Sequence, residues 1–131
     1  MNYIKASVIS IETFEDITIV GFEAGNETLV MMSLELDRSL KVGSNVMLAL
    51  KATTVSLAKE KNTMLSISNQ LPVRITGIDM GKLLCSVKLL FEDTLIESII
   101  TKNSALRMGL NPGDEIVALI KASDLAIAEI L

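Results

Sequence analysis

Hydrophobic and polar positions alternate along most of the chain with a period of two, the pattern of β-strands that bury one face. In the first half this pattern predicts five strands, at residues 6–13, 16–23, 27–32, 46–51 and 55–59. In the second half it predicts five more, at 73–79, 83–91, 94–100, 115–121 and 125–130. Turn residues such as Gly25-Asn26 and Glu92-Asp93 separate neighbouring strands. The chain is therefore predicted to be all-β.

The pattern leaves room for one short helix in each half. Residues 104–108 are preceded by Asn103 or Ser104 as the N-cap and followed by Gly109 as the C-cap. The counterpart in the first half is predicted at residues 34–40, with Ser33 as its cap.

The two halves repeat one another. Residues 41–55 match residues 111–125 with an offset of 70, which aligns Gly43 with Gly113. Residues 4–11 resemble residues 71–78 with an offset of 67. Two matching blocks in the same order indicate a duplication, with a few residues of loop length between them. We expect two tandem units, at 1–62 and 66–131, each an OB-like barrel of five strands and one short helix. Residues 58–68 are the predicted linker, and Asn69 and Gln70 are expected to hold its backbone.

The amino-acid composition argues against several classes of function. The net charge is −4, and three Phe and one Tyr are the aromatic residues, so a basic groove with stacking platforms for nucleic acid is not expected. Histidine is absent, which excludes imidazole-based catalysis and histidine-ligated zinc, and no nucleophile–base set is present; an enzyme is not expected. No apolar stretch reaches the roughly 18 residues that cross a membrane. The single Cys85 fits a reducing cytoplasm.

Half of the residues are hydrophobic, which bears on association. A unit of about 65 residues buries only about 60% of the surface of its unfolded chain. Such hydrophobic small units are expected to bury more surface against other subunits. We therefore expect a homo-oligomer that binds neither nucleic acid nor a membrane.

Three segments of the second half resemble a known family. Residues 109–123 are similar to the signature of the Mop family, also described as the TOBE domain. Residues 100–104 resemble its I-T-x-x-S segment, and residues 66–71 its S-A-R-N-Q-L opening. The resemblance covers nearly all of 66–131, whereas in 1–62 it rests mainly on 41–55.

The resemblance implies a function. Tandem Mop proteins bind the tetrahedral oxyanions molybdate and tungstate in the cytoplasm, without catalysis or a cofactor, for storage, buffering or sensing. The alternative is a molybdate-sensing regulatory module of a transcriptional repressor or of an ABC transporter ATPase. Stand-alone proteins of this kind resemble trimers and sensor modules resemble dimers, and here the trimer is favoured.

The resemblance also implies the binding residues, which are Thr101, Ser104, Lys121, Ala122, Ser123, Ser66 and Ser68. A deprotonated oxyanion offers only acceptors, so hydroxyl groups, backbone N–H groups and an ammonium are suitable partners. In the first half, Lys51, Ala52 and Thr53 repeat the Lys121 segment and could contribute.

Two departures from the family pattern argue against equal binding sites in the two halves. Ser68 stands where the opening motif has an arginine, which removes a bidentate charged partner. Arg74, Arg107 or a lysine of a neighbouring subunit is the alternative source of that charge; otherwise the site is weak or has changed ligand. In the first half, an offset of 70 places Met31 and Leu34 at the positions of Thr101 and Ser104. We therefore expect sites built chiefly from the second half. Lys121 also has a simpler interpretation, as a solvated lysine at a strand end.

Overall fold

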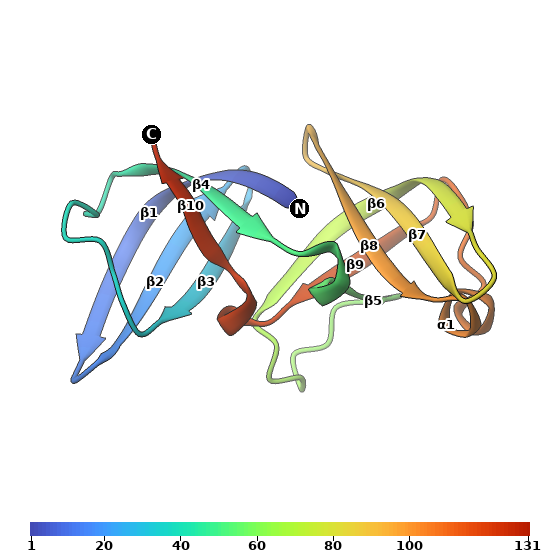
Figure 1. Cartoon of the computed structure of the whole chain (residues 1–131), viewed down its shortest axis with the longest axis horizontal. Helices are drawn as coiled ribbons and strands as arrows, with labels where there is room; N and C mark the ends of the chain where they lie inside the picture. The colour runs from blue at the N-terminus through green and yellow to red at the C-terminus, as the bar shows by residue number, and fades with distance from the viewer.

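The computed structural model describes residues 1–131, and it contains ten strands in two antiparallel five-stranded sheets (Figure 1). The first sheet contains β1 (Asn2–Phe14), β2 (Ile17–Ala24), β3 (Glu27–Ser33), β4 (Asn45–Leu50) and β10 (Ala126–Ile130). The second contains β5 (Ser56–Ala58), β6 (Asn69–Met80), β7 (Leu84–Phe91), β8 (Thr94–Thr101) and β9 (Glu115–Ile120). Every predicted strand is present, so the all-β prediction is confirmed. β1 and β6 both begin about four residues earlier than predicted.

The two sheets exchange their last strands. β10, from the C-terminal end of the chain, pairs with β4, and Ala126 lies opposite Ala49. β5, from the first half, pairs with β9, and Ser56 lies opposite Leu119. In Figure 1 the red β10 accordingly lies among the blue and green strands of the first half. The expected units 1–62 and 66–131 thus describe the sequence repeat, whereas each sheet takes one strand from the other unit.

Two equivalent asparagines hold the halves together. The buried Asn2 donates to the Glu97 carbonyl oxygen at 2.7 Å and accepts from the Glu97 backbone N–H at 2.9 Å. Sixty-seven positions later, the buried Asn69 makes the same pair of bonds to Val30, at 2.9 and 2.8 Å. The first strand of each half is thereby joined to the third strand of the other.

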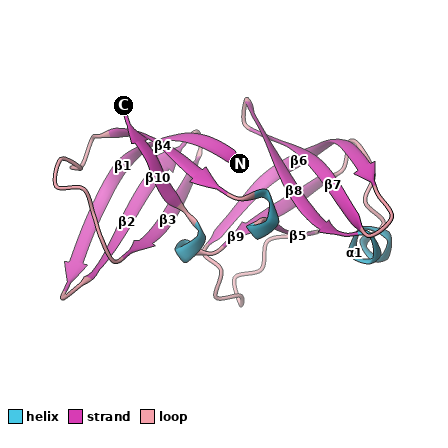
Figure 2. Ribbon diagram, in the orientation of Figure 1, coloured by secondary structure: helices cyan, strands magenta, loops and turns pink.

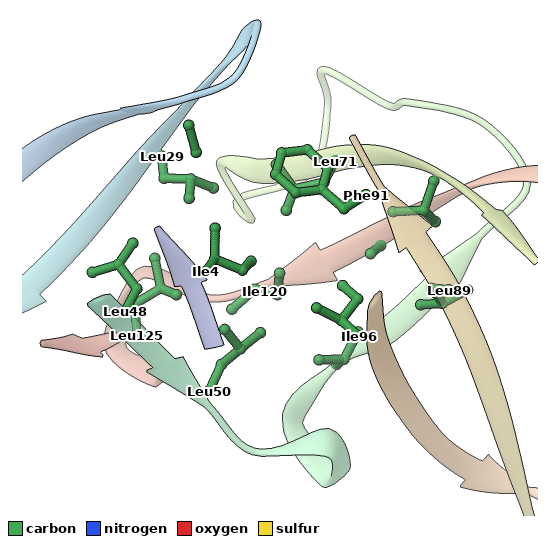
Figure 3. Packing of buried hydrophobic residues seen from close by; sticks show 14 of the residues in the cluster. Ile4, Leu29, Leu48, Leu50, Leu71, Leu89, Phe91, Ile96, Ile120 and Leu125 are labelled. Atoms are coloured by element: carbon green, nitrogen blue, oxygen red, sulfur yellow. The ribbon is translucent and has the colours of Figure 1, made fainter. Parts of the chain in front are cut away.

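The hydrophobic core runs without a break through both sheets. A single cluster of 27 buried residues includes side chains from each half. Figure 3 shows Ile4, Leu48 and Leu125 on one side of this junction and Leu71 and Ile120 on the other. Since the core is shared and strands are exchanged, the halves stabilise one another.

The predicted helix of the second half is confirmed as α1 (Lys102–Met108). Its N-cap is Thr101, two or three residues earlier than predicted, and the Thr101 hydroxyl accepts from the Ser104 N–H at 3.1 Å. Gly109 ends the helix in the left-handed region, at φ 61°, which a residue without Cβ adopts readily. Two further one-turn helices, η1 (Ala52–Thr54) and η2 (Ala122–Asp124), follow β4 and β9 (Figure 2). No helix has the length and apolar character needed to span a membrane.

The helix predicted at 34–40 is wrong, because these residues form turns. The repeat offset is 67 at β3 and β8 and 70 at β4 and β9, so this connection is three residues shorter than its counterpart. Three residues are nearly one helical turn. In addition, the Asp37 carboxylate accepts from the Ser39 N–H at 2.8 Å and from the Ser39 hydroxyl at 2.6 Å, a local turn that competes with a helix.

Candidate functional site

One group of predicted binding residues gathers where β9 ends and β6 begins. Asn69 lies opposite Ile120 as the last pair of the sheet, so Ser68 and Lys121, the next residues along each chain segment, leave the sheet at the same end. Lys121 and Ser123 are exposed, and η2 turns the chain there. Ser66 and Ser68 are exposed as well. The opening motif and the Lys121 corner, residues 121–124, therefore come together at the centre of the molecule.

The equivalent corner of the first half, residues 51–54, lies beside it. Figure 2 shows the two short helices near one another in the middle of the molecule. Lys51 and Thr54 line the same cleft as Ser123 and Asp124, with a volume of about 250 Å³. The strand exchange produces this arrangement, because each corner is the point where the chain leaves one sheet for the other. Ala52 is buried, and Thr53 does not line this cleft.

The second group of predicted residues lies elsewhere. Thr101 and Ser104 sit at the start of α1, which Figure 1 shows at the outer end of the second sheet. The Thr101 hydroxyl donates to the Ser104 Oγ at 2.9 Å, and Arg107 donates from Nη2 to the same oxygen at 3.2 Å. Within one chain, the structure brings these residues together with Arg107 and not with Lys121.

The first half has no comparable hydroxyl pair. The pairing of β2 with β3 and of β7 with β8 keeps the offset at 67 to the strand ends, so Thr101 corresponds to Leu34, and Asp37 lies in the shorter connection that follows. The expected correspondence to Met31 and Leu34 is therefore wrong. Hydrogen bonds from the Ser39 hydroxyl and the Ser39 backbone N–H lower the pKa of Asp37 below its ordinary value. A carboxylate kept ionised at this position repels an anion.

Two further contacts lie near these groups. Arg107 donates to Ser104, one helical turn earlier in the chain, and the i, i+3 spacing of the two residues on α1 accounts for this contact. The Gln70 amide donates to the carbonyl oxygens of Asn62 and Ile67 at 2.8 and 2.9 Å. Gln70 therefore holds the linker backbone, as expected from the sequence.

No group of three or more Cys, Asp or Glu side chains is arranged to hold a metal ion, and histidine is absent. The candidate residues carry hydroxyl, guanidinium and ammonium groups, which donate hydrogen bonds to anions.

Comparison with known proteins gives the family. The TOBE domain family matches residues 65–127. A crystal structure of the cytoplasmic molybdate-binding protein ModG, with molybdate bound, superposes with a TM-score of 0.89 at 30% sequence identity. The superposition covers 96% of this chain and 94% of that one. The chain belongs to the Mop/TOBE family.

Other relatives of this Mop/TOBE protein are larger. The molybdenum import ATP-binding proteins ModC of Brucella abortus (strain 2308) and Brucella suis biovar 1 (strain 1330) are each 38% identical over 87 residues. The match takes in 66% of this chain and 24% of each relative. The Mop/TOBE protein thus corresponds to about a quarter of the length of these transporter subunits.

Proposed function

We propose that this Mop/TOBE protein binds molybdate or tungstate in the cytoplasm without altering it chemically, and that it stores or buffers the anion. The observation that carries the proposal is the end-to-end likeness to ModG, a cytoplasmic molybdate-binding protein, which extends over 96% of the chain. Both strand-exchanged sheets take part in that likeness, so it is not limited to a shared motif.

The chemistry of the Lys121 corner agrees with an anionic ligand. Lys121 supplies a positive charge, Ser123 and Ser68 supply hydroxyls, and all three side chains are exposed. Backbone N–H groups of Ala122 and Ser123 are additional candidates for donors, since they follow the end of β9. Donors alone suit a fully deprotonated oxyanion, whereas phosphate near neutral pH retains a proton that needs an acceptor.

We further propose that each site is completed by a second subunit. Thr101 and Ser104 lie too far from Lys121 in one chain to hold the same anion (Figure 1). Exposed leucines surround them: Leu83 is 82% exposed, Leu84 lies opposite Thr101 on the next strand, and Leu106 on α1 is 59% exposed. Apolar side chains around a polar pair are typical of a subunit interface. The Lys121 corner of one subunit would then face Thr101 and Ser104 of its neighbour.

The trimer is the assembly we favour. Light scattering distinguishes the states, because three chains of 14.2 kDa give about 43 kDa and two give about 28 kDa. A monomer that nevertheless binds molybdate tightly would contradict a site shared between subunits.

The function is tested by thermal shift and calorimetry with molybdate, tungstate, sulfate and phosphate. Molybdate and tungstate are expected to raise the melting temperature most, because a ligand that binds only the folded state stabilises it.

Lys121→Ala is expected to weaken binding about tenfold to a hundredfold, the worth of one hydrogen bond to a charged group. Lys41→Ala, an exposed lysine in the turn before β4, is the control and should bind normally. Absence of any heat or stabilisation at millimolar molybdate would overturn the proposal.

A sensing role is the second candidate, and the match to ModC favours it. In those proteins the corresponding region is part of a longer ATP-binding chain. The length of the reading frame that encodes this sequence separates the two functions, since a sensing module would be joined to a DNA-binding or ATPase domain.

A further inference from the structure

The linker between the halves borders a polar cleft that shares only Ser68 with the site described above. Residues 59–68 fold back toward the start of β3, held by the Gln70 side chain, which also accepts from the Asn62 N–H at 2.8 Å. The cleft has a volume of about 410 Å³ and is lined by Glu27, Thr28, Lys61, Thr63, Leu65, Ile67, Ser68 and Gln70.

The cleft presents hydroxyl groups and one ammonium that can donate hydrogen bonds to an anion. The hydroxyls of Thr28, Thr63 and Ser68 are exposed and make no hydrogen bond within the chain. Lys61 is the cation in this lining, and its ammonium lies 3.6 Å from a carboxylate oxygen of Glu27. The Lys61 side chain is 54% exposed, and an exposed ion pair of this kind contributes little to stability. Lys61 can therefore leave Glu27 for another anion at small cost.

Ser68 links this cleft to the Lys121 corner. It lines the cleft with Lys61, and it directly precedes Asn69, which pairs with Ile120, the residue before Lys121. Within one chain, the Lys121 ammonium supplies a single positive charge for an oxyanion of charge −2, and Asp124 follows in the same corner. A second cation on the other side of Ser68 would supply the missing charge.

We propose that Lys61 is a binding residue for the oxyanion, which lies against Ser68 between Lys61 and Lys121. Glu27 holds Lys61 in place when the ligand is absent, and binding exchanges the Lys61–Glu27 pair for a Lys61–oxyanion pair. The linker is then part of the binding site as well as the connection between the halves. This inference rests on the proposed function, because it names a further residue of the same site.

Calorimetric titration of the full chain with molybdate tests the role of Lys61, with a nearby lysine variant as the control. Lys61→Ala is expected to weaken binding about tenfold or more, the effect of losing one charged hydrogen-bond partner. Lys59→Ala removes an exposed lysine two residues away that forms no ion pair, and should change the affinity less than about twofold, the effect of long-range charge alone. Glu27→Gln frees Lys61 and is expected to strengthen binding.

The outcomes separate this inference from the function on which it rests. If the wild type binds molybdate and Lys121→Ala weakens binding, while Lys61→Ala binds like Lys59→Ala, the role of Lys61 is wrong and the function stands. If the wild type does not bind molybdate, both are wrong. The melting temperatures of the unliganded variants should match the wild type, which shows that lost affinity does not reflect misfolding.

Discussion

Asn69 shows how a single side chain can replace a stretch of sheet. It is completely buried, and its amide forms with Val30 the two hydrogen bonds that a neighbouring strand would form. Asn2 does the same for Glu97. The sequence predicted that Asn69 and Gln70 hold the linker; Gln70 does so, whereas Asn69 joins the two sheets. Its place in the opening motif therefore has a structural explanation, independent of any ligand.

We expect Asn69→Ala to destabilise the protein by about 2–3 kcal/mol, because it leaves a backbone N–H and a carbonyl without partners in a largely buried position. Urea unfolding of the unliganded protein measures this. Asn103→Ala, an exposed asparagine on α1, is the control and should change stability by less than about 0.5 kcal/mol. A wild-type midpoint for Asn69→Ala would contradict the role given to this side chain.

At the scale of elements, the two sheets share the same strand pairing, but the side chains on their outer faces differ. On β7 and β8, the Glu97 carboxylate accepts from Lys88 at 2.5 Å and from the Ser86 hydroxyl. The equivalent first-half positions, 67 residues earlier, hold Ile19, Gly21 and Val30. One duplicated strand pair thus carries an ion pair, whereas its copy presents an apolar surface.

The ion pair between Lys88 and Glu97 makes the stability of the protein depend on pH. Hydrogen bonds from Lys88 and Ser86 lower the pKa of Glu97 below its ordinary value of 4.5. A lowered pKa in the folded state stabilises the protein above the unfolded-state pKa, and this contribution is lost as pH falls through the folded-state pKa. Urea unfolding between pH 6 and pH 3 should therefore show a smaller loss of stability for Glu97→Gln than for the wild type.

The size of that difference is expected to be below about 1 kcal/mol, because the pair is partly exposed. Glu12→Gln, on the corresponding face of β1 and without a side-chain hydrogen bond, should lose stability with acid as the wild type does. An identical acid response of Glu97→Gln and the wild type would show that the pair contributes nothing.

The whole molecule is organised by the exchange of β5 and β10. The exchange places residues 51–54 and 121–124 at one central cleft and leaves α1 at the outer end of the second sheet. It thereby divides the predicted binding residues into two groups that one chain does not bring together. The shared site between subunits that we propose would join these two groups.

Paired cysteines test the exchange. Ala49 and Ala126 lie opposite one another, so Ala49→Cys/Ala126→Cys should form an intrachain disulfide. If β10 instead paired within its own half, as the counterpart of β5, Ala126 would lie opposite Leu119, and Leu119→Cys/Ala126→Cys would cross-link. Both pairs are made with Cys85→Ser, and monomer mobility on a non-reducing gel with peptide mapping identifies the bond. Cross-linking of the second pair alone, or a cross-linked dimer with the first, would contradict exchange within one chain.

Much of the fold could be predicted because its signals are local. Alternating residues located all ten strands, and Gly109 marked the end of α1. The failure at 34–40 has a local cause as well: three missing residues and the Asp37–Ser39 turn outweigh helix propensity. For the site, the donor residues named from the sequence stay a prediction, whereas the contact of Arg107 with Ser104 and the cleft that Lys61 and Ser68 both line came only from the structure.

By itself, the sequence determined the strands, the duplication and the types of donor group, since each depends on spacing along the chain. Only the tertiary structure decided which sheet receives β5 and β10, because backbone hydrogen bonds at a sheet edge are the same for any strand and carry no sequence signal. What selects the exchange is packing: the continuous core and the contacts of Asn2 and Asn69 join residues that are 95 and 39 positions apart. The grouping of the binding residues follows from that choice.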